Sequence, residues 1–241
     1  MTDGRAAVGT DTNPNWPGAA PLAVGLERTR VAMPVEIDPR AAILRNPLSA
    51  RAASFRVLRH RLAERGDPKV ILVTSALDGE GKTTCALNLA LALAESGRHR
   101  VLLLEANTRR PALASLLGFA PPACFLEQLT QRRTDPARSW KVAQLPTHDL
   151  DVLAAQARSE PRAPMHGPTL IAALASLRAA YDYTVVDTSS IITGLDVPVA
   201  EDAADGLVLT ARTRQTRGRD LKIALGRVGV ARVLGVALID G

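Results

Sequence analysis

Aromatic residues are scarce in this chain of 241 residues, where they make up only 3% of the total. Hydrophobic residues nevertheless reach 46%, so the sequence can form a core, but this core has to consist of alanine, leucine and valine. The length allows one substantial α/β domain together with a tail.

Cysteines and long apolar runs are also few. Cys85 and Cys124 form neither a metal-binding spacing nor a disulfide framework, which fits a reducing compartment. The most apolar run, residues 86–94, is too short to cross a bilayer. No apolar stretch follows the first ten residues as it would in a signal peptide, so we expect a cytoplasmic protein.

Lysine occurs only four times, and the net charge of +6 therefore comes almost entirely from arginine. Such a surface suits anionic partners: nucleotide, nucleic acid, anionic lipid or an acidic protein surface. A genome rich in G and C would also enrich arginine, so charge alone does not choose among these partners.

The first 45 residues are predicted to be a flexible tail, because prolines and glycines interrupt every helical or strand period. The predicted domain covers residues 46–241. It begins with an amphipathic helix over 49–65, where Phe55, Leu58 and Leu62 share one face. Residues 112–149 look irregular apart from two short helices.

The segment 69–93 reads KVILVTSALDGEGKTTCALNLALAL and predicts a strand, a glycine loop and a helix. In a P-loop of this kind, backbone N–H groups and the helix N-terminus bind phosphate oxygens. Lys82 would neutralise phosphates and the Thr83 hydroxyl would bind Mg²⁺. The strict P-loop spacing fails at one point, since Ala76 occupies the place of the first glycine. The alternative interpretation is a strand, turn and helix whose glycines only allow a tight turn and bind no phosphate.

Two further predicted strands end in polar residues. Residues 101–104 lead to Glu105, and residues 183–186 lead to Asp187, as in a Walker B motif with a carboxylate near Mg²⁺. Strands that alternate with helices predict a mostly parallel sheet flanked by helices, a P-loop NTPase fold, in which these residues share one edge.

Six ordered blocks resemble the cytoplasmic domain of the bacterial tyrosine kinases (BY-kinases) of capsule and exopolysaccharide assembly. The helix at 54–59 is similar to the family's E-A-F-R-x-L-R, and 71–84 to its I-L-V-T-S-A-x-P-G-E-G-K-T-T loop. Residues 101–111 resemble the second acidic motif, Walker A′ (V-L-L-I-D-A-D-x-R-R-P). The remaining blocks are 181–190, similar to Y-D-Y-V-I-I-D-T-P-P, 205–212, similar to D-G-V-L-L-V-V-R, and a closing strand at 232–237.

The chain departs from this pattern at several positions. Glu105 and Asn107 replace the two Walker A′ aspartates. The resemblance implies the first of these aspartates, at the position of Glu105, in metal handling and in activating the tyrosine hydroxyl. Asp78 replaces the loop proline, and Ala53 replaces a helix glutamate implied in ring contacts, although Arg56 and Arg59 remain. The C-terminal tyrosine cluster is absent, which excludes autophosphorylation of such a tail.

The resemblance implies ATP and Mg²⁺ as ligands. We expect the nucleotide to be bound by Gly79, Glu80, Gly81, Lys82, Thr83, Thr84 and Arg212. The expected metal ligands are Thr83, Glu105 and Asp187, and the expected catalytic residues are Lys82, Glu105 and Asp187.

These expectations lead to a first hypothesis, an ATP-binding regulator with weak or no kinase activity that governs exopolysaccharide export. It would dock on the cytoplasmic face of a membrane polysaccharide co-polymerase, and a homo-oligomer is a further candidate assembly. A second hypothesis is an active protein-tyrosine kinase that acts on a partner protein. A third is a ParA/MinD-like positioning ATPase, but Leu77 stands where those proteins carry an extra lysine, and nucleic acid is not favoured as a partner.

Overall fold

The computed structural model describes residues 25–156, 167–194 and 196–240. Their centre is an eight-stranded sheet with the strand order β1-β4-β5-β3-β6-β2-β7-β8. The β4–β5 pair is antiparallel, and the other neighbouring strands are parallel. The strands are β1 (Leu26–Arg30), β2 (Val70–Ser75), β3 (Val101–Glu105), β4 (Trp140–Gln144), β5 (Asp151–Leu153), β6 (Tyr183–Asp187), β7 (Gly206–Arg212) and β8 (Val233–Ile239).

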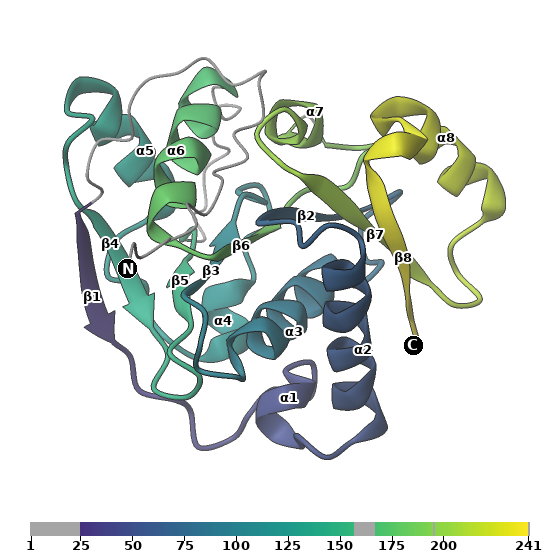
Figure 1. Ribbon diagram of the computed structural model, residues 1–241, viewed down its shortest axis with the longest axis horizontal. Helices are drawn as coiled ribbons and strands as arrows, with labels where there is room; N and C mark the ends of the chain where they lie inside the picture. The colour runs from purple at the N-terminus through teal and green to yellow at the C-terminus, as the bar shows by residue number, and fades with distance from the viewer. Residues whose placement is uncertain (1–24, 157–166, 195, 241) are drawn as a thin grey trace, which may run out of the picture.

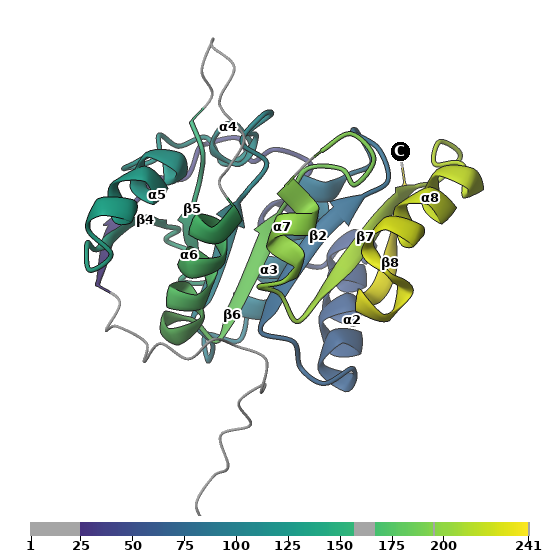
Figure 2. The ribbon, with the colours of Figure 1, turned by 90° about the horizontal axis from the view of Figure 1, so that it is seen from above.

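Helices cover both faces of the sheet (Figures 1 and 2). The helices on one face are α1 (Ala42–Arg45), α2 (Ala50–Glu64), α3 (Lys82–Ala94) and α4 (Leu113–Leu117). Those on the other face are α5 (Phe125–Thr134), α6 (Gly167–Ala180), α7 (Asp196–Glu201) and α8 (Gly218–Val228). The predicted P-loop NTPase fold, a mostly parallel sheet between helices, is confirmed.

The sheet separates two hydrophobic cores, because successive side chains of a strand point to opposite faces. In β3, Leu103 joins the core beneath α3, whereas Leu102 and Leu104 join the core beneath α6. Every residue of β2 is buried, as expected for a central strand covered on both faces. The few aromatic residues are compensated by leucine, valine and alanine, as the composition predicts.

Residues 25–45 differ from the predicted tail. Residues 1–24 of that tail lie outside the described residues, but Leu26–Arg30 forms β1, which pairs in parallel with β4 at the edge of the sheet. The chain then crosses the α3 face, where the Asn88 side chain accepts a hydrogen bond from the Ile43 N–H and donates one to the Arg40 carbonyl. Proline and glycine content misled the prediction here, because these residues find their partners in distant parts of the chain.

The predicted amphipathic helix is present as α2. Ser49 caps it, since its side chain accepts a hydrogen bond from the Ala52 N–H. Phe55 and Leu62 are buried beneath the helix. In the part of the chain that the structure describes, no helix is long and apolar enough to span a membrane.

The parallel arrangement brings the carboxyl ends of β2, β3 and β6 to one edge of the sheet. Glu105 at the end of β3 lies opposite Asp187 at the end of β6, and Asp187 lies opposite Val73 of β2. This edge lies beside the loop that joins β2 to α3, so the polar residues predicted from three separate motifs lie together.

Candidate functional site

The loop between β2 and α3 has the backbone of a phosphate-binding loop. Gly79 and Gly81 both adopt positive φ, +84° and +85°, a region that glycine enters without strain. Gly81 is the N-cap of α3, so the first N–H groups of this long helix point into the loop. Such unpaired N–H groups, together with the helix dipole, bind anions.

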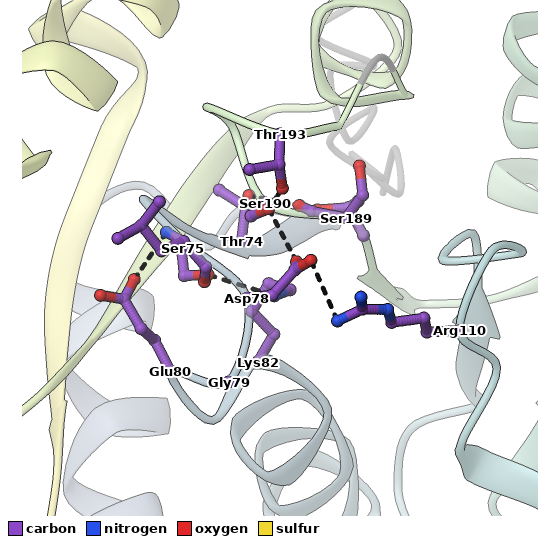
Figure 3. Close-up of polar contacts among 12 residues, drawn as sticks. Thr74, Ser75, Asp78, Gly79, Glu80, Lys82, Arg110, Ser189, Ser190 and Thr193 are labelled. Carbon is purple, nitrogen blue, oxygen red and sulfur yellow. Dashed lines mark hydrogen bonds and ion pairs between the residues drawn. The ribbon is translucent and has the colours of Figure 1, made fainter.

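Lys82 lies at the start of α3 and is 6% exposed. Its Nζ donates a hydrogen bond to Ser75 Oγ at 3.2 Å and lies 3.6 Å from Asp78 Oδ1 (Figure 3). The Lys82 ammonium group is thus held at the loop, at the position where the sequence predicts a phosphate ligand.

Thr83 and Asp187 form a buried pair beneath the loop. The Thr83 hydroxyl donates to Asp187 Oδ2 at 2.7 Å. The other carboxylate oxygen, Oδ1, is buried and has no hydrogen-bond partner among the described residues. Burial raises the pKa of Asp187 to about 7, with a smaller contribution from the charge of Glu105, against the opposing effects of Thr83 and Lys82.

This pair fits a magnesium ion. Mg²⁺ in nucleotide sites takes one or two protein oxygens and fills its remaining positions with phosphate oxygens and water. The unpartnered Oδ1 of Asp187 and the Thr83 hydroxyl are such oxygens, and a cation beside them would remove the cost of a buried negative charge. Within the described residues, no group of three or more His, Cys, Asp or Glu side chains is placed to hold a metal on its own.

Glu105, the third predicted metal ligand, has a different environment. Its Oε1 accepts hydrogen bonds from the N–H groups of Ala112 and Leu113, and its Oε2 accepts one from the N–H of Ala155 at 2.9 Å. The carboxylate therefore holds the start of α4 and the chain after β5. A metal ion or a substrate proton at this carboxylate would compete with these hydrogen bonds for its oxygens.

The other predicted nucleotide residues lie at the same loop. Glu80 is buried and braces the loop, because its carboxylate accepts hydrogen bonds from the Leu77 N–H and the Thr216 hydroxyl. Arg212 at the end of β7 reaches the Gly79 carbonyl at 3.4 Å. Thr84 follows in the first turn of α3, where its carbonyl accepts a hydrogen bond from the Asn88 side chain.

Three residues at this edge were not predicted as part of the site. Ser75 binds Lys82, whereas Arg110 and Ser190 both contact Asp78 (Figure 3). Ser75 ends β2, and Ser190 follows β6 closely, so their positions after parallel strands are the sequence signal that could have identified them.

Two arginines of the family-like helix motif and both tyrosines of the chain lie away from this edge. Arg56 forms an ion pair with Glu95, and Arg59 donates to the Ala92 carbonyl, so both bind the end of α3 in their own chain. Tyr181 precedes β6 and Tyr183 begins it; their hydroxyls donate to Asp151 and Asp67.

Known proteins with similar sequences include kinases and a polysaccharide transport protein. The chain is 29% identical over 202 residues to the succinoglycan biosynthesis transport protein ExoP of Rhizobium meliloti, covering 80% of this chain and 25% of that protein. It is also 29% identical over 174 residues to the tyrosine-protein kinase YwqD of Bacillus subtilis, covering 70% and 72% of the two chains. The chain thus spans about a quarter of the length of the Rhizobium protein. No protein-family model matches it.

Solved structures show the same similarity. The kinase domain of VpsO superposes with a TM-score of 0.66 at 26% identity, covering 79% of this chain and 96% of that one. The kinase domain of the Escherichia coli tyrosine kinase ETK superposes with a TM-score of 0.69 at 20% identity, covering 83% and 79%. The cell division ATPase MinD of Pyrococcus furiosus, with a TM-score of 0.58 at 20% identity over 70% of each chain, shares the fold. The P-loop, the Walker B strand and the helix α2 follow in the same order as the motifs compared above. The chain is therefore similar to the kinase domain of the BY-kinases.

Proposed function

We propose that this chain is an ATP-binding regulator of exopolysaccharide or capsule biosynthesis and export, with weak or no protein-tyrosine kinase activity. The observation that carries the proposal is the arrangement of Lys82 and the Thr83–Asp187 pair, in which a buried carboxylate oxygen lacks a partner among the described residues. Similarity to tyrosine-protein kinases, which use a nucleotide, supports the same conclusion.

In this proposal the glycine loop and the start of α3 bind the phosphates. The backbone N–H groups from Gly79 to Thr84 provide hydrogen bonds, and Lys82 neutralises negative charge. Thr83 and Asp187 hold Mg²⁺, which when bound offsets the charge of the phosphates. Arg212 and Glu80 keep the loop in shape through Gly79, Leu77 and Thr216.

Weak or absent kinase activity is proposed from two features of the second acidic motif. Glu105 is engaged by three backbone N–H groups, so its carboxylate is not free to take a proton from a substrate hydroxyl. Asn107 stands in place of the other aspartate and carries no charge. The loss of a positioned base typically lowers a rate about 10²–10⁴-fold.

The proposed partner is the cytoplasmic face of a membrane polysaccharide co-polymerase, which would recruit the chain from the cytoplasm to the inner face of the membrane. The name of the Rhizobium relative, a succinoglycan biosynthesis transport protein, supports this pathway. That relative is about four times as long as the matched region, so most of it lies outside the part that resembles this chain. A homo-oligomer is a second proposed assembly.

Calorimetry of Mg-ATP binding to the wild type and to Lys82→Ala tests the proposed nucleotide site. We expect binding by the wild type and its loss in the variant, because the variant lacks the only cation that is buried in the loop among the described residues. Lys141→Ala is the matched control, since Lys141 lies half exposed on β4, in a different part of the sheet. Equal affinities in wild type and Lys82→Ala would contradict the proposal.

The second candidate is an active tyrosine kinase that acts on a partner, which the names of several relatives favour. Transfer of phosphate from ATP to a tyrosine peptide separates the two functions. If the chain is a regulator, we expect little or no turnover. If it is a kinase, we expect clear turnover that Asp187→Asn abolishes.

A further inference from the structure

Asp78 lies at the centre of a polar cluster in the P-loop (Figure 3). Its Oδ1 accepts a hydrogen bond from Ser190 Oγ at 2.8 Å and lies 3.6 Å from Lys82 Nζ. Its Oδ2 lies 3.3 Å from Arg110 Nη1. We call these four residues, Asp78, Lys82, Arg110 and Ser190, the Asp78 cluster.

The Asp78 carboxylate is ionised in this environment. Burial acts to raise its pKa, but the Ser190 hydroxyl, Lys82 and Arg110 together lower the pKa below the usual range. The group therefore carries a full negative charge at neutral pH, directly beside the lysine of the loop.

The cluster connects three segments that are far apart in the sequence. Asp78 belongs to the loop after β2, Arg110 to the segment after β3, and Ser190 to the segment after β6. Ser190 also contacts the Thr193 hydroxyl, and Arg109 donates to the Thr193 carbonyl at 3.4 Å. The side chain of Asp78 thus joins the P-loop to both neighbouring motif segments.

A carboxylate in this position resembles a phosphate group chemically. Both are anions that accept hydrogen bonds from hydroxyl groups, from lysine and from arginine, and arginine in particular binds either of them. Lys82 is buried, so without an anion nearby its charge would be costly. Asp78 provides such an anion, 3.6 Å from Lys82 Nζ.

We propose that Asp78 is an internal counter-anion that competes with nucleotide phosphate for Lys82 and Arg110, so that nucleotide binding breaks the Asp78 cluster. This inference rests on the proposed nucleotide-binding function. Bound phosphate separates the Asp78 side chain from Lys82 and Arg110 and frees the segments at Arg110 and Ser190. Nucleotide affinity is lower than the loop alone would allow, and the state of the site is communicated to two neighbouring segments.

Removal of the negative charge tests the competition. We expect Asp78→Asn to bind Mg-ATP about tenfold more tightly than the wild type in calorimetry, because the nucleotide no longer displaces an anion. Asp78→Ala, which removes the hydrogen-bond acceptor as well, is expected to bind at least as tightly as the wild type. Asp182→Asn is the matched control: its carboxylate is exposed to a similar extent, 36% against 40%, and forms a 3.3 Å pair with Arg100 away from the loop. The control is expected to bind like the wild type.

A double-mutant cycle in the absence of nucleotide tests the cluster itself. We expect Arg110→Gln to lower the unfolding temperature of the wild type but to have little effect in the Asp78→Asn background. Additive effects of the two substitutions would show that the ion pair does not stabilise the fold, which is true of many exposed ion pairs. That result would overturn the inference.

The outcomes separate this inference from the proposed function. Unchanged or weaker binding by Asp78→Asn, with binding still lost in Lys82→Ala, overturns the role of Asp78 and leaves the nucleotide site intact. Absence of binding by the wild type and by both Asp78 variants overturns the proposed function and the competition together. Binding by Asp78→Asn but not by the wild type supports the nucleotide site and the competition, because Asp78 then prevents the wild type from binding nucleotide.

Discussion

Glu105 and Asp187 lie directly opposite each other on β3 and β6, yet their carboxylates have opposite environments. Three backbone N–H groups donate hydrogen bonds to Glu105, whereas Asp187 has one buried oxygen without a partner among the described residues. The longer side chain of Glu105 reaches backbone groups of α4 and of the segment after β5. Glu105 therefore binds the backbone, and Asp187 keeps one unpaired buried oxygen, which we propose as the cation ligand.

Shortening Glu105 is expected to weaken the fold, even though aspartate is the residue that the resembling family carries at this position. In Glu105→Asp the carboxylate loses reach toward Ala112 or Ala155, which leaves buried N–H groups unpaired. A hydrogen bond to a charged group contributes about 1.5–3 kcal/mol, so we expect a loss of that size in the free energy of unfolding by urea. An unchanged urea midpoint would contradict the structural role of Glu105.

Replacing Asp187 by asparagine is expected to change how stability depends on pH. The pKa of Asp187 rises from 3.8 to about 7 on folding, so the folded state binds the proton more strongly and wild-type stability falls as pH rises from about 4 to about 7. The Asp187→Asn variant should not lose stability in this way, because asparagine does not titrate. The difference in unfolding temperature, variant minus wild type, should therefore be larger at pH 8 than at pH 5.

Asp182→Asn serves as the control for this pH comparison. The pKa of Asp182 is lowered, since hydrogen bonds from Arg100 outweigh the effect of burial, so Asp182 stays ionised throughout this interval. Its difference from the wild type should not change between pH 5 and pH 8. A parallel pH response of both variants would contradict the assignment to Asp187.

Gly81 is expected to be the less replaceable of the two loop glycines. An added Cβ would strain the backbone at either position, but at Gly81 it would also lie 3.0 Å from the Ile239 side chain, whereas nothing lies within 4 Å at Gly79. The left-handed conformation alone costs about 1–2 kcal/mol. We expect Gly81→Ala to lower the unfolding temperature more than Gly79→Ala, and the additional change Ile239→Ala to restore part of the loss.

Arg56 is expected to stabilise its own chain through Glu95. The guanidinium Nε donates to Glu95 Oε2 at 2.7 Å, and Nη1 donates to the Pro47 carbonyl at 2.7 Å. Arg56→Ala and Glu95→Gln should each lower the unfolding temperature, with less than additive effects when combined. Sedimentation of the Arg56→Ala variant should match that of the wild type. A change of assembly state would instead assign Arg56 to a subunit contact.

Several elements could be predicted because their signals are local. The strand, glycine loop and helix at 69–93 have a characteristic order, and α2 has both a capping serine and an apolar face. β1 and β4 could not be predicted in this way. β1 has the sequence LERTR, is largely exposed, and is held at the edge of the sheet by β4 and by the bond from Arg28 to Asp151. An edge strand such as β1 shows little alternation of apolar and polar residues by which it could be recognised.

The sequence by itself determined the P-loop, the parallel sheet and the presence of Lys82, Thr83 and Asp187 at one edge, since periodicity and the ends of parallel strands are local properties. Only the tertiary structure decided what each carboxylate does. Glu105, Asp187 and Asp78 all follow or lie near strand ends, but their hydrogen-bond partners come from segments distant in the sequence. Burial and these distant partners determine whether a carboxylate binds backbone N–H groups, keeps an unpaired oxygen or pairs with Lys82. A one-dimensional pattern does not contain this information.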